Sequence, residues 1–276
     1  HDRAGYGPAA QLRADGLQAM RRWVAPPTAK EAADAWERSA VDWIALVREQ
    51  KSAWREHVIL PAFWRLVGDV SGKRLVDLGC GEGAVTRELT RAGAHCTGVD
   101  LTPTLISAAR EEAARQGLDI TYRLGDMTDP SPFEPGSFDL VVSVMALTEP
   151  PNGLDTFAVA SRLLKPGGEM VFIIPHPVLE RGEWEADDEG LRTACVIRDY
   201  YGPAVVLEKV ARWFRDEAYQ FCFNLSDYLN ALAEAGLMIL ASEEPVPDAA
   251  GLEEHPKLRW FLKISPLWAV RARKVP

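Results

Sequence analysis

The chain has 276 residues, of which 47% are hydrophobic and 26% are charged, and its formal net charge is −9. These proportions predict a globular protein with one core and a cap, and they exclude the basic surface that nucleic-acid binding requires. The apolar runs are too short to cross a membrane, and no basic segment followed by an apolar core opens the chain, so we expect a cytoplasmic protein.

Residues 1–70 are predicted to form a helical N-terminal cap. Thr28 and Glu31 have the spacing of a capping box, and the apolar positions after them recur at helical intervals: Trp36, Ala40, Trp43, Ile44 and Val47. A shorter helix is expected at Leu12, Met20, Trp23 and Val24. Because this segment precedes the first expected strand, we expect it to fold over the core and close the site.

Residues 71–276 are predicted to form an α/β core. Strands and helices alternate from residue 74 to about residue 174, which is typical of a mostly parallel sheet with helices on both faces. The segment 177–225 interrupts this rhythm and is expected to be an aromatic-rich insertion. A helix over 226–235 and closing strands over 237–241 and 267–273 are expected to follow it.

A glycine turn follows the first strand of this core, in the sequence Asp77-Leu-Gly-Cys-Gly-Glu-Gly83. Glycines let a ligand approach the backbone, and a helix that opens directly after them presents free N–H groups. The spacing Gly79-x-Gly81-x-x-Ala84 also satisfies the dinucleotide fingerprint. In a dinucleotide site, however, an acid at position 77 would repel the pyrophosphate, so the pattern favours a cationic ligand.

The pattern D-x-G-x-G-x-G resembles motif I of the class I S-adenosylmethionine-dependent methyltransferases. Strand ends at Asp100 and Asp126, a buried strand over 138–145 and a Pro-Gly turn at 166–167 follow in the family's order, so the resemblance covers residues 70–176. It implies a Rossmann-like, mostly parallel seven-stranded sheet and S-adenosylmethionine as cofactor. The cofactor-binding residues that it implies are Arg55, Asp77, Gly79, Cys80, Gly81, Gly83, Asp100, Leu101, Asp126, Met127 and Ser143.

The resemblance also implies roles for single residues. Asp100 would accept hydrogen bonds from the ribose hydroxyls, Asp126 would face the adenine amino group, and Arg55 would pair with the cofactor's carboxylate. Because a sulfonium methyl is already activated, the protein needs to position the acceptor and, for some acceptors, to remove a proton.

Candidate acceptor-site residues follow the fifth strand. His176 is a candidate general base for a hydroxyl acceptor, and Tyr200 and Tyr201 are candidates for orienting it. Nine of the 24 aromatic residues lie within 177–228, which predicts an apolar pocket, a small core of the insertion, or both. The run Glu149-Pro-Pro-Asn152 lacks the aromatic residue of the amino-group methyltransferase motif, so it is not counted as a site.

We therefore expect transfer of a methyl group to an oxygen or nitrogen of a small molecule, such as a natural-product intermediate. A methyltransferase for protein side chains and a non-catalytic Rossmann-like nucleotide-binding module are the alternatives. His57, His95 and His255 show no ligand spacing and the four cysteines show no paired spacing, so we expect no metal and free thiols. The oligomeric state is not predicted.

Overall fold

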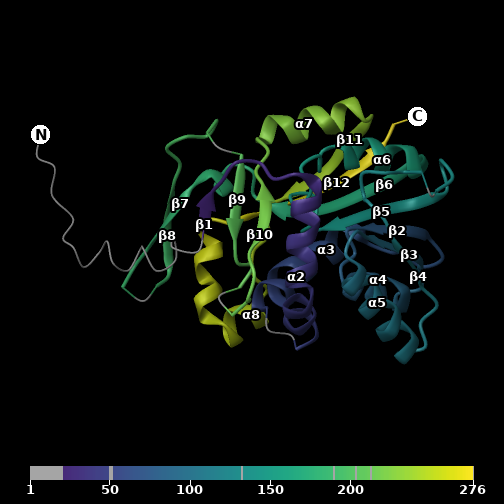
Figure 1. Ribbon diagram of the computed structural model, residues 1–276, viewed down its shortest axis with the longest axis horizontal. Helices are drawn as coiled ribbons and strands as arrows, with labels where there is room; N and C mark the ends of the chain where they lie inside the picture. The colour runs from purple at the N-terminus through teal and green to yellow at the C-terminus, as the bar shows by residue number, and fades with distance from the viewer. Residues whose placement is uncertain are drawn as a thin grey trace, which may run out of the picture.

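The computed structural model describes residues 21–49, 52–131, 133–188, 190–202, 204–211 and 213–275. A seven-stranded sheet with the order β11-β12-β6-β5-β2-β3-β4 forms its centre (Figure 1). The strands from β6 to β4 run parallel, and β12 is antiparallel to both of its neighbours, which confirms the predicted Rossmann-like sheet. The strands are β2 (Arg74–Leu78), β3 (His95–Asp100), β4 (Thr121–Leu124), β5 (Phe138–Val144), β6 (Leu164–Pro175), β11 (Leu237–Glu243) and β12 (Leu267–Lys274).

Helices cover both faces of this sheet (Figure 1). On one face Phe157 of α6 and Tyr228 of α7 pack in the same cluster as Phe172 of β6. On the other face Phe63 of α3 and Leu89 of α4 are fully buried among strand residues. The helices of these layers are α3 (Leu60–Val67), α4 (Ala84–Arg91), α5 (Pro103–Arg115), α6 (Asp155–Leu163) and α7 (Leu225–Glu234).

The N-terminal segment combines one long helix with a strand. The capping box predicted at Thr28 is present and opens α2 (Ala29–Arg48). Residues 21–23 form strand β1 rather than the expected shorter helix, because they pair antiparallel with β9 (Val205–Glu208) of the insertion. The remaining part of that expected helix, with Leu12 and Met20, lies outside the described residues.

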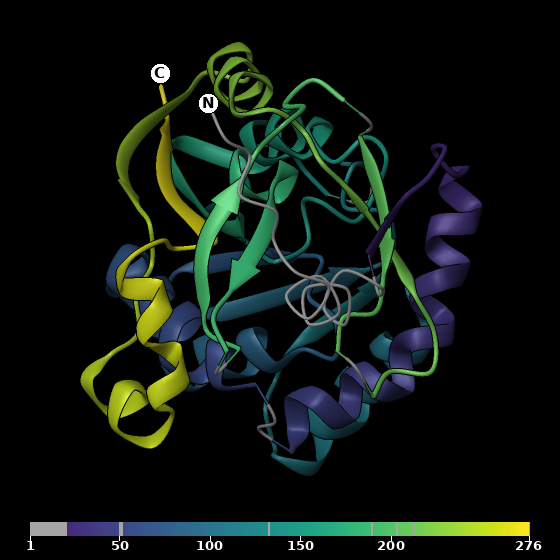
Figure 2. The same cartoon turned by 90° about the vertical axis from the view of Figure 1, so that its left-hand side faces the viewer.

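The insertion contributes further strands, of which β10 lies against α2 (Figure 2). Strand β10 (Ala218–Phe221) completes a small β1-β9-β10 sheet, and β7 (Glu183–Ala186) pairs with β8 (Arg192–Val196) after a short helical turn η2 (Leu179–Arg181). Three short helical segments, η1 (Arg55–Ile59), α8 (Ala249–Glu254) and η3 (Pro256–Leu262), complete the fold. None of the helices in the described ranges has the length and apolarity needed to span a bilayer.

The boundary between a cap at residues 1–70 and a core at residues 71–276 remains a prediction. Within the first of these ranges α3 belongs to the helix layer on the large sheet, whereas α2 lies against α5 and β10. The N-terminal segment thus contributes both to the core and to the structure that covers the strand ends.

Candidate active site

The glycine turn has the conformation that its sequence predicts. Gly79, Gly81 and Gly83 have φ values of 77°, 56° and 81°, a region that favours glycine. A Cβ at residue 79 would lie 2.3 Å from the Cβ of Ala146, so the close approach of two strand ends also requires glycine there. The N–H groups of Gly79 and Cys80 both donate to the Val99 carbonyl at 2.9 Å, which holds the turn against β3.

A buried carboxylate, Asp77, and a partly buried one, Asp100, lie beside this turn. The Asp77 carboxylate accepts a hydrogen bond of 2.6 Å from the Thr86 hydroxyl. Burial and, to a smaller extent, the charge of Asp100 raise the pKa of Asp77 to about 7, against the lowering effect of the Thr86 hydrogen bond. The Asp100 carboxylate accepts from the backbone N–H groups of Gly81 at 2.8 Å and Thr102 at 2.9 Å, and burial raises its pKa as well.

These residues line one cavity of about 1250 Å³ at the carboxyl ends of the parallel strands. Its wall also includes Asp126, whose carboxylate accepts from the backbone and hydroxyl of Thr128 at 2.8 and 2.7 Å. Ligands of open α/β sheets bind at this edge. The predicted cofactor-site residues that line the cavity are Arg55, Asp77, Gly79, Cys80, Gly81, Asp100, Leu101, Asp126 and Met127.

Two predicted cofactor residues lie behind the cavity wall. Gly83 is the N-cap of α4, and a Cβ there would lie 2.3 Å from the Tyr122 hydroxyl. Glycine is therefore required at this position for the Tyr122 side chain to pack against it. Ser143 is fully buried and donates to the Leu78 carbonyl at 2.8 Å, which supports the end of β2. A contact of either residue with a cofactor has no support in this placement.

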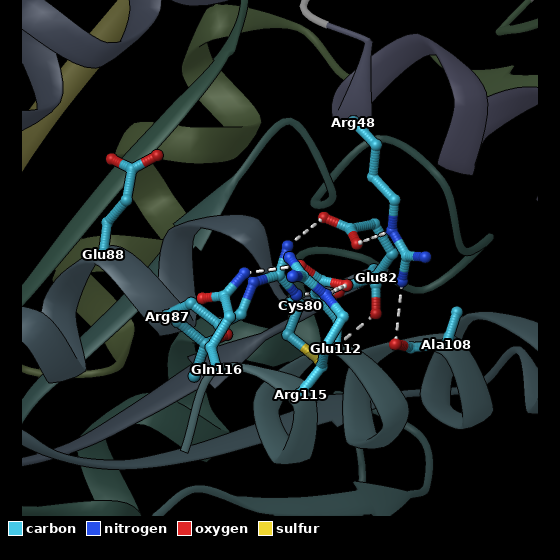
Figure 3. Close-up of polar contacts among 12 residues, drawn as sticks. Arg48, Cys80, Glu82, Arg87, Glu88, Ala108, Glu112, Arg115 and Gln116 are labelled. Atoms are coloured by element: carbon cyan, nitrogen blue, oxygen red, sulfur yellow. Dashed lines mark hydrogen bonds and ion pairs between the residues drawn. The ribbon is translucent and has the colours of Figure 1, made fainter. Parts of the chain in front are cut away.

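Helix α2 forms the opposite wall and is tied to the glycine turn by charge. The Glu82 carboxylate, with its side chain only 1% exposed, accepts from Arg87 of α4 at 2.7 Å and from Arg48 of α2 at 3.0 Å (Figure 3). Arg48 also donates to the carbonyl of Ala108 in α5 at 2.8 Å. Trp36 and Trp43 of α2 reach the cavity. This arrangement agrees with the expectation that the N-terminal segment covers the site.

The candidate base His176 lies outside this cavity. Its Nε2 is 3.0 Å from a carboxylate oxygen of Glu244, and its Nδ1 accepts from the backbone N–H of Val178. The preceding residue, Pro175, does line the cavity. Because successive residues of an extended strand point to opposite sides, the imidazole faces a separate, smaller pocket beside β11. The geometry does not support a role for His176 in proton transfer.

The two candidate tyrosines also lie away from the cavity. The Tyr200 hydroxyl accepts from the backbone N–H of Leu225 at 2.8 Å, at the start of α7. Tyr201 is 82% exposed and contacts the ring of Tyr200. Of the aromatic residues predicted to form a pocket, Trp184, Trp213 and Tyr219 line the cavity. Others, such as Phe214, are buried in the packing of the insertion.

The cavity contains charged residues that the sequence analysis did not identify. Glu149 lines it after β5, and Glu180 and Glu208 line it from the insertion. Arg21 of β1 lies 2.9 Å from Glu180 and 3.8 Å from Glu208. The position of Glu149 just after β5 could have identified it from the sequence, because ligands bind at the carboxyl ends of parallel strands. Residues 149–152 were excluded as a site because they do not match the amino-group methyltransferase motif.

Two of the histidines that show no ligand spacing in the sequence, His57 and His255, lie close together in the structure. Nitrogen atoms of His57 and His255 and a carboxylate oxygen of Glu254 lie within 4.8 Å of one another. The Nδ1 of His57 is 3.1 Å from Asp248. Elements η1 and α8 bring together residues that are almost two hundred positions apart. The group offers ligands of the types that zinc accepts, but Glu254 and His255 are exposed, and such groups are common on surfaces.

Comparisons with known proteins agree with this geometry. The family described as "Methyltransferase domain" matches residues 76–172. A curated ubiquinone biosynthesis O-methyltransferase from Nitrosococcus oceani is 40% identical over 103 residues, which cover 37% of this chain and 44% of that protein. A homologue from Methylococcus capsulatus with the same name is 36% identical over 103 residues. The alignments thus span less than half the length of these curated relatives.

Solved structures match over a larger part of the chain. An S-adenosylmethionine-dependent methyltransferase from Mesorhizobium loti is 30% identical with a TM-score of 0.65, and the alignment covers 80% of this chain and 98% of that one. A structure from Listeria monocytogenes, described as a putative enzyme of the same kind, is 21% identical with a TM-score of 0.64, over 77% and 94% of the two chains; it supports the fold. The chain therefore belongs to the class I S-adenosylmethionine-dependent methyltransferases, and its cofactor is S-adenosylmethionine.

Proposed function

We propose that this protein transfers a methyl group from S-adenosylmethionine to an oxygen or nitrogen atom of a small molecule. The observation that carries the proposal is the cavity of about 1250 Å³, which is lined by the glycine turn, by tryptophans of α2 and by the insertion. Pockets for one drug-sized ligand have volumes of about 300–1000 Å³. This cavity therefore has room for a cofactor and a second molecule together.

The residues of the glycine turn fit a cationic cofactor. Asp77 and Asp100 add negative charge beside backbone that only glycine permits, which suits an ammonium or sulfonium and disfavours a pyrophosphate. Asp100 and Asp126 have carboxylate lone pairs beyond those used by the backbone, so they can also accept from ribose hydroxyls and an adenine amino group. When bound, the cofactor supplies an activated methyl group.

The remaining walls suit a small acceptor. Trp36, Trp43, Trp54 and Trp184 line the cavity, and such rings bind apolar or aromatic molecules and exclude water from them. The names of the curated relatives support oxygen as the atom methylated. A protein side chain remains the alternative substrate, and the cytoplasmic location remains a prediction from the sequence.

The test combines binding with product detection. Calorimetry should show binding of S-adenosylhomocysteine and no binding of NADH. Incubation with S-adenosylmethionine and a panel of phenols and primary amines should then give products heavier by one methylene unit in mass spectra. Binding of NADH in place of S-adenosylhomocysteine would refute the proposal, and methylation confined to added protein would favour the alternative substrate.

A further inference from the structure

The loop after β5 holds Glu149 rigidly at the cavity. Met145, at the start of this loop, has a φ of 57°, and its N–H donates to the Ile173 carbonyl at 2.7 Å. The Thr148 carbonyl accepts from the N–H of Phe221 at 2.7 Å, which ties the loop to β10 of the insertion. The loop is thus fixed to the large sheet at one end and to the insertion at the other, so the Glu149 side chain starts from a well-defined backbone.

The Glu149 side chain is partly buried at the cavity wall and has no basic partner among the described residues. One oxygen, Oε2, accepts from the indole N–H of Trp36 at 2.7 Å. The other, Oε1, has only a long contact of 3.3 Å with the Thr148 hydroxyl. That second oxygen is therefore available to a molecule in the cavity.

The surroundings of Glu149 favour its protonated form. Burial and, to a smaller extent, the charges of Glu208 and Glu180 raise the pKa of Glu149 to about 8, against the lowering effect of the hydrogen bonds from Trp36 and Thr148. Arg21 lies between these two acids and compensates them in part. The Tyr228 hydroxyl is a further titratable group nearby, and its own pKa is raised by burial. A carboxyl group that titrates near working pH has the property required of a general base.

We infer that Glu149 is the general base of the methyl transfer and that the acceptor is a hydroxyl compound, specifically a phenol. This inference rests on the proposed function. As the acceptor oxygen bonds to the methyl carbon, the carbon–sulfur bond breaks, its electron pair returns to sulfur, and the hydroxyl proton passes to Glu149 Oε1. The tryptophans that line the cavity favour an aromatic ring on the acceptor.

A purely structural role for Glu149 would consist of anchoring α2 through Trp36. Glutamine can accept the same indole N–H bond with its amide oxygen, but it cannot take up a proton. Glu149→Gln therefore separates the two roles. Glu149→Asp keeps the carboxylate and withdraws it by one methylene. Glu234→Gln, an exposed site on α7 outside the cavity, is the matched control.

The first readout needs no acceptor. In infrared difference spectra, wild-type protein should show the carbonyl band of a protonated carboxyl group that disappears around pH 8. Glu149→Gln should lack this band, and Glu234→Gln should retain it. A carbonyl band that is present in wild type and absent in Glu149→Gln belongs to Glu149. If no such band titrates above pH 6, the inference is overturned.

The second readout uses catechol, 3,4-dihydroxybenzoate and phenethylamine as probes between pH 6 and 10. Glu149→Gln should lower kcat for the phenols by about 10²–10⁴ and abolish the rise of rate around pH 8, with S-adenosylhomocysteine affinity within about twofold of wild type. Glu149→Asp should keep the pH profile at a lower rate. With a nitro-substituted catechol, which ionises without a base, Glu149→Gln should lower kcat far less than with the other phenols.

Three outcomes contradict the inference. They are a loss below tenfold in Glu149→Gln with an unchanged pH profile, methylation of the amine alone, and intact S-adenosylhomocysteine binding with no methylation of any phenol. None of these outcomes contradicts the binding of the cofactor at the glycine turn. Failure to bind S-adenosylhomocysteine would instead refute the proposed function.

Discussion

Replacement of Asp100 by alanine tests the cofactor site most directly. Its carboxylate already accepts two backbone hydrogen bonds, from Gly81 at 2.8 Å and Thr102 at 2.9 Å, and so connects the glycine turn to the start of α5. Each hydrogen bond to a charged group contributes about 1.5–3 kcal/mol, and 1.4 kcal/mol corresponds to about tenfold in affinity. Loss of the bonds to two ribose hydroxyls therefore removes about 3 kcal/mol or more and should weaken S-adenosylhomocysteine binding by at least about a hundredfold.

Two variants make this measurement specific. Asp100→Asn keeps one oxygen and should retain part of the binding. Asp129→Ala is the matched control, because Asp129 also accepts two bonds, from the backbone and hydroxyl of Ser131 at 2.8 and 2.7 Å, but lies in an exposed turn outside the cavity. Affinity is measured by calorimetry at pH 8, and folding by urea denaturation. Unchanged affinity in Asp100→Ala, or an equal loss in Asp129→Ala, would refute the reasoning.

Three further predictions concern the turn and its cover. Gly79→Ala should abolish S-adenosylhomocysteine binding in calorimetry and lower the melting temperature, because its Cβ would lie 2.3 Å from that of Ala146; normal binding would show that the strand ends can separate. The pKa of Asp77 is raised to about 7, so its contribution to stability is present below about pH 4 and lost as the pH rises through 7. Asp77→Asn should flatten that decline in urea titrations, and an unaltered pH dependence would contradict the assignment. Deletion of residues 1–27 removes β1 and its pairing with β9, and it should reduce the turnover rate strongly but the free energy of unfolding only slightly. An undiminished rate would show that this segment is not needed for the reaction.

The features predicted correctly from the sequence are those set by neighbouring residues. The turn at 77–83 and the acids at 100 and 126 each follow directly on a strand, and parallel strands bring their carboxyl ends to one edge. Local spacing was therefore enough to place eight of the expected cofactor residues around one cavity, which the ninth, Arg55, reaches from η1. The capping box at Thr28 is local in the same sense.

The features that were missed depend on contacts between distant segments. The side to which His176 points is set by the pairing of β6 with β12, in which Pro175 lies opposite Leu267. The hydrogen bond between Trp36 and Glu149 joins residues 113 positions apart. The strand at residues 21–23 exists because β9 of the insertion offers it a partner. The pattern of residues within one segment does not reveal which distant segment it contacts.

The position of Glu82 between two arginines has a thermodynamic consequence. Its carboxylate joins the glycine turn to α2 through Arg48 and to α4 through Arg87. The ordering of the turn and the docking of α2 are therefore coupled equilibria, and linkage requires such a coupling to be reciprocal. By whatever factor the docking of α2 increases the affinity for a molecule at the turn, that molecule favours the docking of α2 by the same factor.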